Sequence, residues 1–287
     1  MPRRRVLARL VVSAPGQAVL REGETLPMKI IVCVKHVPDA SGDRGFAADN
    51  TTDRQRVEGR LSELDEYAVE QALRIVESGV EAEVTYLTVG PSPAVDALRR
   101  ALAMGGNGAV HVVDDSLHGS DALVTSQVLA AAIGRLGFDL VICGMASTDG
   151  TMGVVPAMLA ERLGVPQVTQ ASELSVTADG AVRVRRDSDT ASQRLEAQLP
   201  AVVSVTDWTG EARYPSFKGI MAAKKKPLET LSCSDLGIDA STVGLAGSAT
   251  TVLEAKKRPP RQAGTIVKDE GDGGLKLAEF LAAQKFI

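Results

Sequence analysis

The residues whose types and spacing could do chemistry lie in one glycine-bearing loop, residues 144–153, which reads Gly-Met-Ala-Ser-Thr-Asp-Gly-Thr-Met-Gly. Small residues there let backbone N–H groups, and the N-terminus of a following helix, approach an anionic group such as a phosphate. The alternative is a capped strand-to-helix turn, with Asp149 or Thr151 as the N-cap. The loop by itself is compatible with both, so it predicts either a phosphate site or a capped turn.

Other catalytic patterns are absent from the sequence. His36, His111 and His118 are scattered and lack the spacing of metal ligands. No G-x-S-x-G elbow indicates a covalent hydrolase. The G-x-G-x-x-G fingerprint of dinucleotide binding is missing after the first predicted strand, where the chain reads Lys-His-Val-Pro-Asp over residues 35–39. We therefore expect no catalytic residue and no metal site, and a standard nicotinamide dehydrogenase is disfavoured.

The composition narrows the function classes further. The chain has 287 residues, a net charge of −4 and 44% hydrophobic residues, an ordinary globular composition whose acidic balance argues against nucleic-acid binding. Its three cysteines are far apart, which excludes a disulfide scaffold and a zinc ribbon. No apolar run approaches the roughly 18 residues of a membrane span. These features predict a cytoplasmic protein that does not insert into a membrane.

The elements that must position the loop follow an alternating pattern from Met28 onward. Short β-branched runs alternate with segments whose apolar residues recur every three or four positions. The predicted strands are 29–35, 83–89, 109–113 and 139–143, and the predicted helices are 62–78, 94–104, 120–135 and 154–163. Four successive β–α units imply an α/β fold with a doubly wound, mostly parallel, Rossmann-like sheet.

The two ends of the chain follow different patterns. Beyond residue 170, two short alternating segments flank Asp179-Gly180 and predict a β-hairpin insertion, and one more buried strand is expected at 200–205. Residues 228–287 have few apolar blocks and predict an extended C-terminal arm that ends in a helix at 275–285. We interpret residues 1–27 as an N-terminal extension without a fold, with a targeting peptide as the alternative.

A motif near residue 220 connects the sequence to a known family. Residues 213–227, Arg-Tyr-Pro-Ser-Phe-Lys-Gly-Ile-Met-Ala-Ala-Lys-Lys-Lys-Pro, closely resemble the C-terminal hallmark of the beta subunit of electron transfer flavoprotein. An upstream signature of that family is matched in outline by Val184, Arg186, Asp189, Gln193 and Leu195. The matches are collinear and cover essentially residues 28–240.

The resemblance implies a heterodimer and a role. In this family one FAD is held mainly by the alpha subunit, while the beta subunit binds an adenine nucleotide, usually AMP, and docks partner dehydrogenases such as acyl-CoA dehydrogenases. Electrons then pass to a membrane quinone oxidoreductase, and the beta subunit has no catalytic turnover of its own. Residues 28–227 would form the adenine-nucleotide-binding domain, and the arm would pack on the alpha subunit. Two alternatives are a stand-alone nucleotide-binding protein of the universal-stress type and an enzyme acting on an adenylated substrate.

The resemblance also implies site residues. The nucleotide pocket would be lined by Cys33, Ser62, Glu63, Leu64, Asp65, Val89, Gly144, Met145, Ala146, Ser147, Thr148, Asp149, Gly150, Thr151, Met152, Gly153, Val154 and Val155. Val154 and Val155 stand where relatives commonly have Gln-Thr, so two side chains that could hold a phosphate are missing. Relatives that bifurcate electrons hold a second FAD in this pocket. The stretch Asp149-Gly150-Thr151 shares only part of their pattern, so AMP is favoured over FAD.

Partner contacts are implied for five residues. Tyr214 and Phe217 belong to the docking loop, with Phe217 where the family places an apolar side chain that inserts into dehydrogenases. Ile220 and Met221 follow at helical spacing, and we expect both to pack inward, with a short amphipathic turn as the purely structural alternative. Asp187 stands where some members have a glutamate that pairs with an arginine of the alpha subunit.

Overall fold

The computed structural model describes residues 26–177, 179–260 and 264–287. The interpretation of the N-terminal extension concerns residues 1–27, nearly all of which lie outside this part of the chain. The chain divides into two compact units, one that ends at Val252 and one that comprises Leu253–Ile287.

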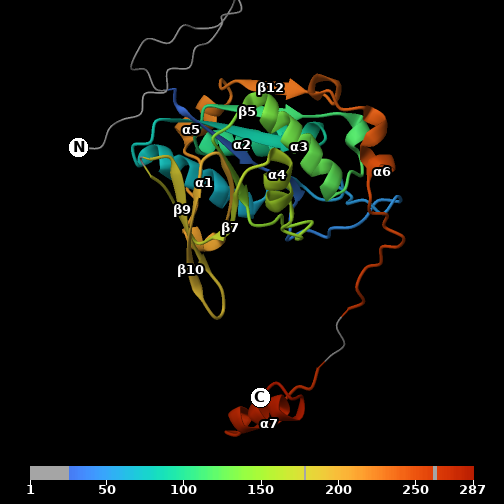
Figure 1. The fold of residues 1–287 in the computed structure, drawn as a ribbon. Coiled ribbons are helices and arrows are strands. Elements are labelled where there is room, and N and C mark those ends of the chain that lie inside the picture. Colours follow the sequence, from blue (N-terminus) through green and yellow to red (C-terminus); the bar gives the residue numbers. More distant parts are fainter. Residues whose placement is uncertain (1–25, 178, 261–263) are drawn as a thin grey trace, which may run out of the picture. The chain divides into compact units, whose positions relative to one another are not determined.

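The first unit contains a sheet of seven parallel strands in the order β12-β5-β4-β1-β6-β11-β7 (Figure 1). The strands are β1 (Met28–Cys33), β4 (Ala82–Val89), β5 (Gly108–Val112), β6 (Leu140–Gly144), β7 (Gln167–Ala171), β11 (Ala201–Val205) and β12 (Leu228–Leu231). The central strands are continuous β-branched and aliphatic runs because both of their faces are buried.

Helices cover both faces of this sheet. Residues of α1 (Glu63–Glu77) and α2 (Val95–Met104) pack with Ile30 and Val32 of β1 on one face. Residues of α3 (Ala122–Leu136) and α4 (Val155–Leu163) pack with Ile31 of the same strand on the other face. Neighbouring residues of one strand therefore point to opposite cores, as the pleat requires. This confirms the predicted doubly wound α/β fold.

A second, antiparallel sheet is inserted in the chain between β7 and β11 of the main sheet. It contains β8 (Glu173–Val176), β9 (Ala181–Asp187) and β10 (Ser192–Gln198), and the hairpin of β9 and β10 projects from the body in Figure 1. The hairpin of β8 and β9 is the predicted one. The sequence did not indicate β10, because only Leu195 and Ala197 in that polar segment pack against the core. A two-stranded ribbon, β2 (His36–Pro38) with β3 (Gly59–Leu61), was also not predicted.

The C-terminal part begins later than the sequence predicted. Strand β12 pairs with β5 at the sheet edge, so residues 228–252 belong to the first unit and not to an arm. Lys226, two residues before β12, donates from its Nζ to the carbonyls of Leu102 and Gly105 at the end of α2, both at 2.9 Å. These bonds hold the start of β12 near β5. In the second unit, α7 (Gly273–Ala283) lies close to the helix predicted at 275–285. The remaining helical segments are α5 (Phe217–Ala223), α6 (Gly244–Gly247), η1 (Ser92–Ala94), η2 (Asp115–Leu117), η3 (Asp207–Thr209), η4 (Ser234–Leu236) and η5 (Ala240–Thr242).

The strand order creates a crevice between β1 and β6. The chain leaves β1 through α1 toward β4 on one side, whereas β6 continues through α4 toward the other side. Loops diverge at such a switch point, and ligands of open α/β sheets bind outside the carboxyl ends of the strands there. The glycine-bearing loop at 144–153 follows β6 directly and therefore lies at this edge.

Helix α5 packs on α2 through small residues. A Cβ atom at Gly219 would overlap the carbonyl oxygen of Ala103, and Ala223, one turn later, is buried. Arg99 of α2 donates to the carbonyl of Ala223 at 2.6 Å and so caps the end of α5. The two backbones approach closely because neither contact residue of α5 has a bulky side chain.

We predict that Gly219→Ala destabilises the protein by about 1–3 kcal/mol, because the added methyl group must push α5 away from backbone atoms of α2 that cannot yield. The matched control is Gly134→Ala in α3, where a Cβ would meet open space. Removing that exposed helical glycine should stabilise the fold by about 0.5–1 kcal/mol. Urea unfolding of the two variants measures both changes, and equal stability for Gly219→Ala and the parent would contradict the proposed packing.

Candidate functional site

The carboxyl ends of β1 and β6 meet the start of α1. Cys33 and Cys143 are register partners on these two strands, and Gly144 follows at the end of β6. A Cβ at Gly144 would lie 2.5 Å from Asp65 Oδ1 and 2.7 Å from the Leu64 carbonyl oxygen. Only glycine allows the first turn of α1 to approach the end of β6 this closely.

Asp65 is the buried polar group that joins these segments. Its carboxylate accepts the backbone N–H of Lys35 at 2.9 Å and also interacts with the N–H of Gly144. Burial raises the pKa of Asp65 to about 7, and the two N–H groups and the Lys35 charge only partly offset this. One side chain thus connects the end of β1, the end of β6 and the N-terminus of α1.

Cations that the sequence had not singled out surround the glycine-bearing loop. Lys35 Nζ lies 2.8 Å from Asp149 Oδ1, and Arg54 Nη2 lies 3.5 Å from Asp149 Oδ2. Arg44 donates to the carbonyl of Thr148 at 2.8 Å. Burial by itself would raise the pKa of Asp149, but Lys35, Ser147 and the backbone N–H of Gly150 together more than offset this, and the pKa falls to about 2. The three cations come from the β1 end and the 39–60 loop, so only the folded chain brings them to residues 147–150.

The loop conformation contradicts the capped-turn alternative. Helix α4 begins at Val155, and its N-cap is Val154, which supplies no side-chain cap. Asp149 accepts the N–H of the next residue, Gly150, at 2.7 Å, and therefore does not cap the helix. Thr151 adopts a left-handed conformation with φ 55°. The start of α4 therefore has no side-chain cap, which is compatible with an anion site at its backbone N–H groups.

The predicted pocket residues gather at this edge, with one unpartnered group among them. Ser62 is fully buried just before α1, and its Oγ has no hydrogen-bond partner within the described part of the chain. Val89 ends β4, the strand next to β1. Met152 is 70% exposed at the outside of the loop. The structure thus brings together segments 33, 62–65, 89 and 144–155, which are far apart in the sequence.

The buried thiol of Cys143 at this edge is not suited to nucleophilic chemistry. A hydrogen bond with Cys33 and burial raise the pKa of the Cys143 thiol. A thiol must ionise to act as a nucleophile, so this environment keeps Cys143 in its unreactive form.

A strap of residues 206–213 connects β11 with the expected docking segment, residues 214–223, and lies along α1. Arg74 donates to the carbonyls of Thr209 and Glu211 at 3.0 and 3.1 Å. Arg213 donates to the buried carboxylate of Glu70, at 2.7 Å from its Nε, and to Glu77. Helix α1 therefore fixes the path of the strap up to the first residue of the family hallmark.

The expected docking residues are exposed, including two that we predicted to be buried. Tyr214 is 88% and Phe217 is 80% exposed. The prediction that Ile220 and Met221 pack inward is wrong, because they are 44% and 50% exposed. Gly219 and Ala223 occupy the inward side of α5, which turns the larger side chains outward. The segment precedes β12 and contacts the end of α2, so it lies at the amino edge of the sheet, opposite the glycine-bearing loop.

Asp187 has partners within the chain. Its carboxylate accepts hydrogen bonds from Ser172 at 2.5 Å and from Ser192, and it forms an ion pair with Arg185 at 3.0 Å. These contacts lower the pKa of Asp187. An arginine of another subunit would thus meet a carboxylate that already has three partners.

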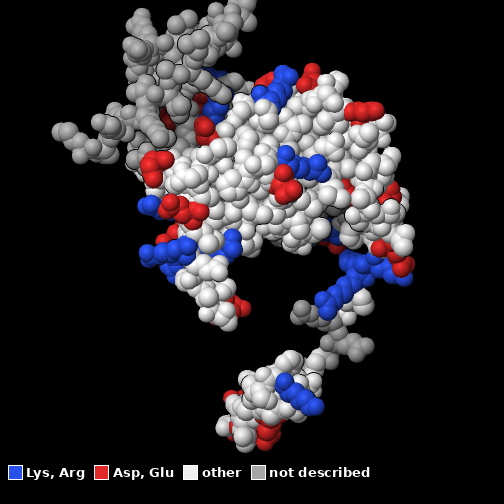
Figure 2. Space-filling model, in the orientation of Figure 1, with Lys and Arg blue, Asp and Glu red and all other residues white. Residues whose placement is uncertain are grey.

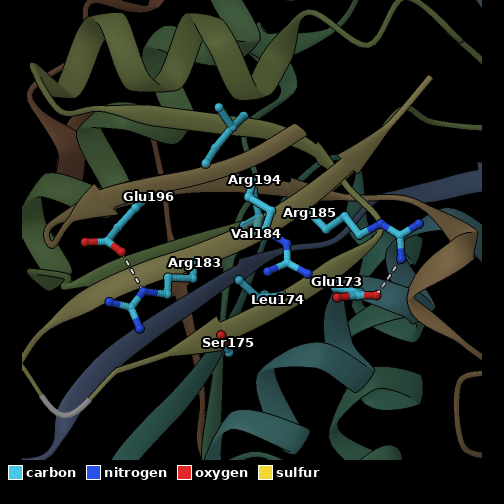
Figure 3. A pocket seen from close by; sticks show the side chains of 9 residues that line it. Glu173, Leu174, Ser175, Arg183, Val184, Arg185, Arg194 and Glu196 are labelled. Atoms are coloured by element: carbon cyan, nitrogen blue, oxygen red, sulfur yellow. Dashed lines mark hydrogen bonds and ion pairs between the residues drawn. The ribbon is translucent and has the colours of Figure 1, made fainter. Parts of the chain in front are cut away.

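The antiparallel sheet of β8, β9 and β10 has a hollow whose charged side chains form ion pairs with one another. The hollow, about 560 Å³, is drawn in Figure 3, where the dashed lines join Arg183 to Glu196 and Arg185 to Glu173. It lies on β8, β9 and β10, away from the strand ends that carry the glycine-bearing loop. Basic and acidic groups also lie side by side on the face of the molecule that Figure 2 shows. Within the described residues, no helix is long and apolar enough to cross a membrane.

Comparison with known proteins places the chain in a family. Residues 49–236 match the model of the electron transfer flavoprotein domain. The chain is 46% identical to an electron transfer flavoprotein subunit beta of Mycobacterium tuberculosis, over 90% of this chain and 99% of that protein. It is 34% identical to the subunit beta of Megasphaera elsdenii, over 91% and 100%, and 34% identical to the acryloyl-CoA reductase electron transfer subunit gamma of Anaerotignum propionicum, over 84% and 92%. The chain therefore belongs to the electron transfer flavoprotein family, as one of its beta subunits.

Proposed function

We propose that this chain pairs with an FAD-carrying alpha subunit in the cytoplasm and accepts electrons from dehydrogenases, acyl-CoA dehydrogenases of fatty acid oxidation among them. The complex then delivers the electrons to a membrane quinone oxidoreductase. The observation that carries the proposal is the match to beta subunits over nine-tenths of the chain. No feature of the described residues favours the universal-stress alternative over this assignment.

FAD supplies the electron-transfer chemistry when it is bound, and we assign most of its site to the alpha subunit. The missing dinucleotide fingerprint after β1 supports this division. The second unit supports it too, because Leu275, Leu277 and Phe280 of α7 are more than half exposed. A helix with such a face is suited to packing on another chain.

We propose AMP as the nucleotide of the beta subunit. The uncapped start of α4, the buried Ser62 hydroxyl and the backbone N–H groups of the loop suit a phosphorylated ligand. Lys35, Arg44 and Arg54 outnumber the two acidic groups Asp149 and Asp65 beside them, and this excess of cations would complement a phosphate monoester. In this proposal Lys35 takes over the role of the side chains that Val154 and Val155 cannot supply. Because no reactive side chain adjoins the loop, AMP would be structural.

The first prediction of this proposal concerns FAD. The isolated chain should bind no stable FAD, whereas co-expression with its alpha subunit should give a yellow complex with one FAD. Absorbance spectra and cofactor analysis of the two preparations measure this. Stoichiometric FAD on the single chain would contradict the assignment, or would indicate a second FAD in place of AMP.

The second prediction concerns the loop. Lys35→Met and Gly150→Val should each reduce AMP retained by the purified complex at least tenfold, which corresponds to about 1.4 kcal/mol. Lys35→Met removes a cation. Gly150→Val adds a side chain whose Cβ would lie 3.3 Å from Ser147 Oγ, with two methyl groups beyond it. Mass spectrometry of the denatured complex measures the nucleotide. Lys29→Met, at the other end of β1, is the control, and a parent complex that releases no nucleotide from this subunit would refute the proposed site.

The third prediction concerns docking. Phe217→Ala should slow electron acceptance from a dehydrogenase about tenfold or more, since exposed aromatic anchors often contribute about 2 kcal/mol to an interface. FAD content and melting temperature should stay unchanged because the ring is 80% exposed. Phe46→Ala, which removes another exposed ring, is the control. A Phe217→Ala protein that loses FAD, or melts several degrees lower, would show that the residue stabilises the fold.

A further inference from the structure

Trp208 is an exposed aromatic residue outside the expected docking segment. It is the single tryptophan of the chain, and 69% of its surface is exposed. It lies in η3, three residues after β11 ends at Val205. Tryptophan is among the residues most enriched at the energetic centres of protein interfaces, so its exposure on a structured surface calls for a partner.

The turn that presents Trp208 is rigidly held. Thr206 Oγ1 accepts the N–H of Trp208, and Thr209 Oγ1 donates to the Thr206 carbonyl at 2.8 Å. Gln71 and Arg74 of α1 both donate to the carbonyl of Thr209. The backbone at Trp208 is therefore held in place, and an interface that uses the indole has little backbone to order on binding.

Carboxylates surround this turn. Burial and the charges of Asp207, Glu63, Glu66 and Glu211 together raise the pKa of Tyr67 on α1. Glu63 and Glu66 have cationic neighbours, Arg60 at 3.7 Å and Arg100 at 3.4 Å. Asp207 and Glu211 are exposed and form no ion pair with the described residues. The surface next to the indole thus has negative charge left to neutralise.

The position of Trp208 separates it from Phe217. The backbone N–H of Met145, in the glycine-bearing loop, donates to the carbonyl of Val205 at 2.9 Å, so the end of β11 adjoins the candidate nucleotide site. Trp208 follows in the turn after this edge, and the carbonyl of the next residue, Thr209, accepts hydrogen bonds from Gln71 and Arg74 of α1. Phe217 lies at the amino edge, beside the end of α2. One partner surface that covers the nucleotide edge would meet Trp208 without covering the dehydrogenase anchor.

We propose that Trp208, Asp207 and Glu211 form a docking surface for an arginine- or lysine-bearing segment of the FAD-carrying alpha subunit. A cation over the indole face gains from the π electrons, and the two carboxylates neutralise its charge. This inference rests on the proposed function, since it requires an alpha subunit. It assigns to that subunit a polar, cation-binding contact that is distinct from the apolar dehydrogenase contact at Phe217.

The test uses the full heterodimer. Trp208→Ala should raise the dissociation constant of the two subunits at least tenfold, and Asp207→Lys/Glu211→Lys should do the same while flattening its dependence on salt. Glu81→Lys, an exposed acid before β4 at the opposite edge, is the charge control and should change the constant less than twofold. Sedimentation at several salt concentrations gives the constants. Melting of each isolated variant at the parent temperature checks that the fold is intact.

The outcomes separate this inference from the proposed function. If the parent chain binds no FAD-carrying subunit, the proposed function fails and this surface loses its partner. If the parent binds but all variants bind equally well, only the Trp208 inference is overturned. It is equally overturned if Trp208→Ala leaves subunit affinity unchanged and instead slows electron transfer from the dehydrogenase.

Discussion

The two buried carboxylates of α1 need hydrogen-bond or ion-pair partners, and several distant segments of the chain supply them. Asp65 and Glu70 of α1 are 6% and 4% exposed, and a buried carboxylate is costly unless it is paired or hydrogen-bonded. Asp65 obtains its donors from the backbone at the ends of β1 and β6, and Glu70 obtains Arg74 and Arg213. The first set of bonds fixes the crevice beside the glycine-bearing loop. The second fixes the strap that leads to the docking segment.

Helix α1 thereby determines the separation of two surfaces. Its N-terminus belongs to the carboxyl edge of the sheet, where the glycine-bearing loop lies, and its last turns hold Arg213 near the amino edge. The exposed aromatic residues Tyr214 and Phe217 follow directly. A nucleotide at one edge and a dehydrogenase at the other would not compete for space. This arrangement is compatible with a nucleotide that supports the fold without taking part in electron transfer.

The charges around the loop are arranged to tolerate an anion. Asp149 by itself would repel a phosphate, but Lys35 and Arg54 neutralise it and hold it against the loop backbone. Arg44 adds a further cation at the Thr148 carbonyl. Since α4 has no side-chain cap, its first N–H groups complete a positive environment built mainly from main-chain donors.

Local sequence patterns predicted most of the helices and strands and the fold class. Periodicity predicted the parallel strands β1, β4, β5, β6 and β11 and the four large helices, because each buries apolar residues in a pattern that is visible locally, but it missed β7 and β12. The hallmark at 213–227 indicated the family. Only the tertiary structure decided which distant side chains meet. Lys35 and Arg54 reach Asp149, and Arg44 reaches the carbonyl of Thr148, from segments about 100 residues away. Ile220 and Met221 point outward because Gly219 and Ala223 fit against α2, and β10 and β12 are strands although their sequences are mostly polar or short. Such outcomes depend on contacts between residues far apart in the chain, and the local pattern of side chains does not contain them.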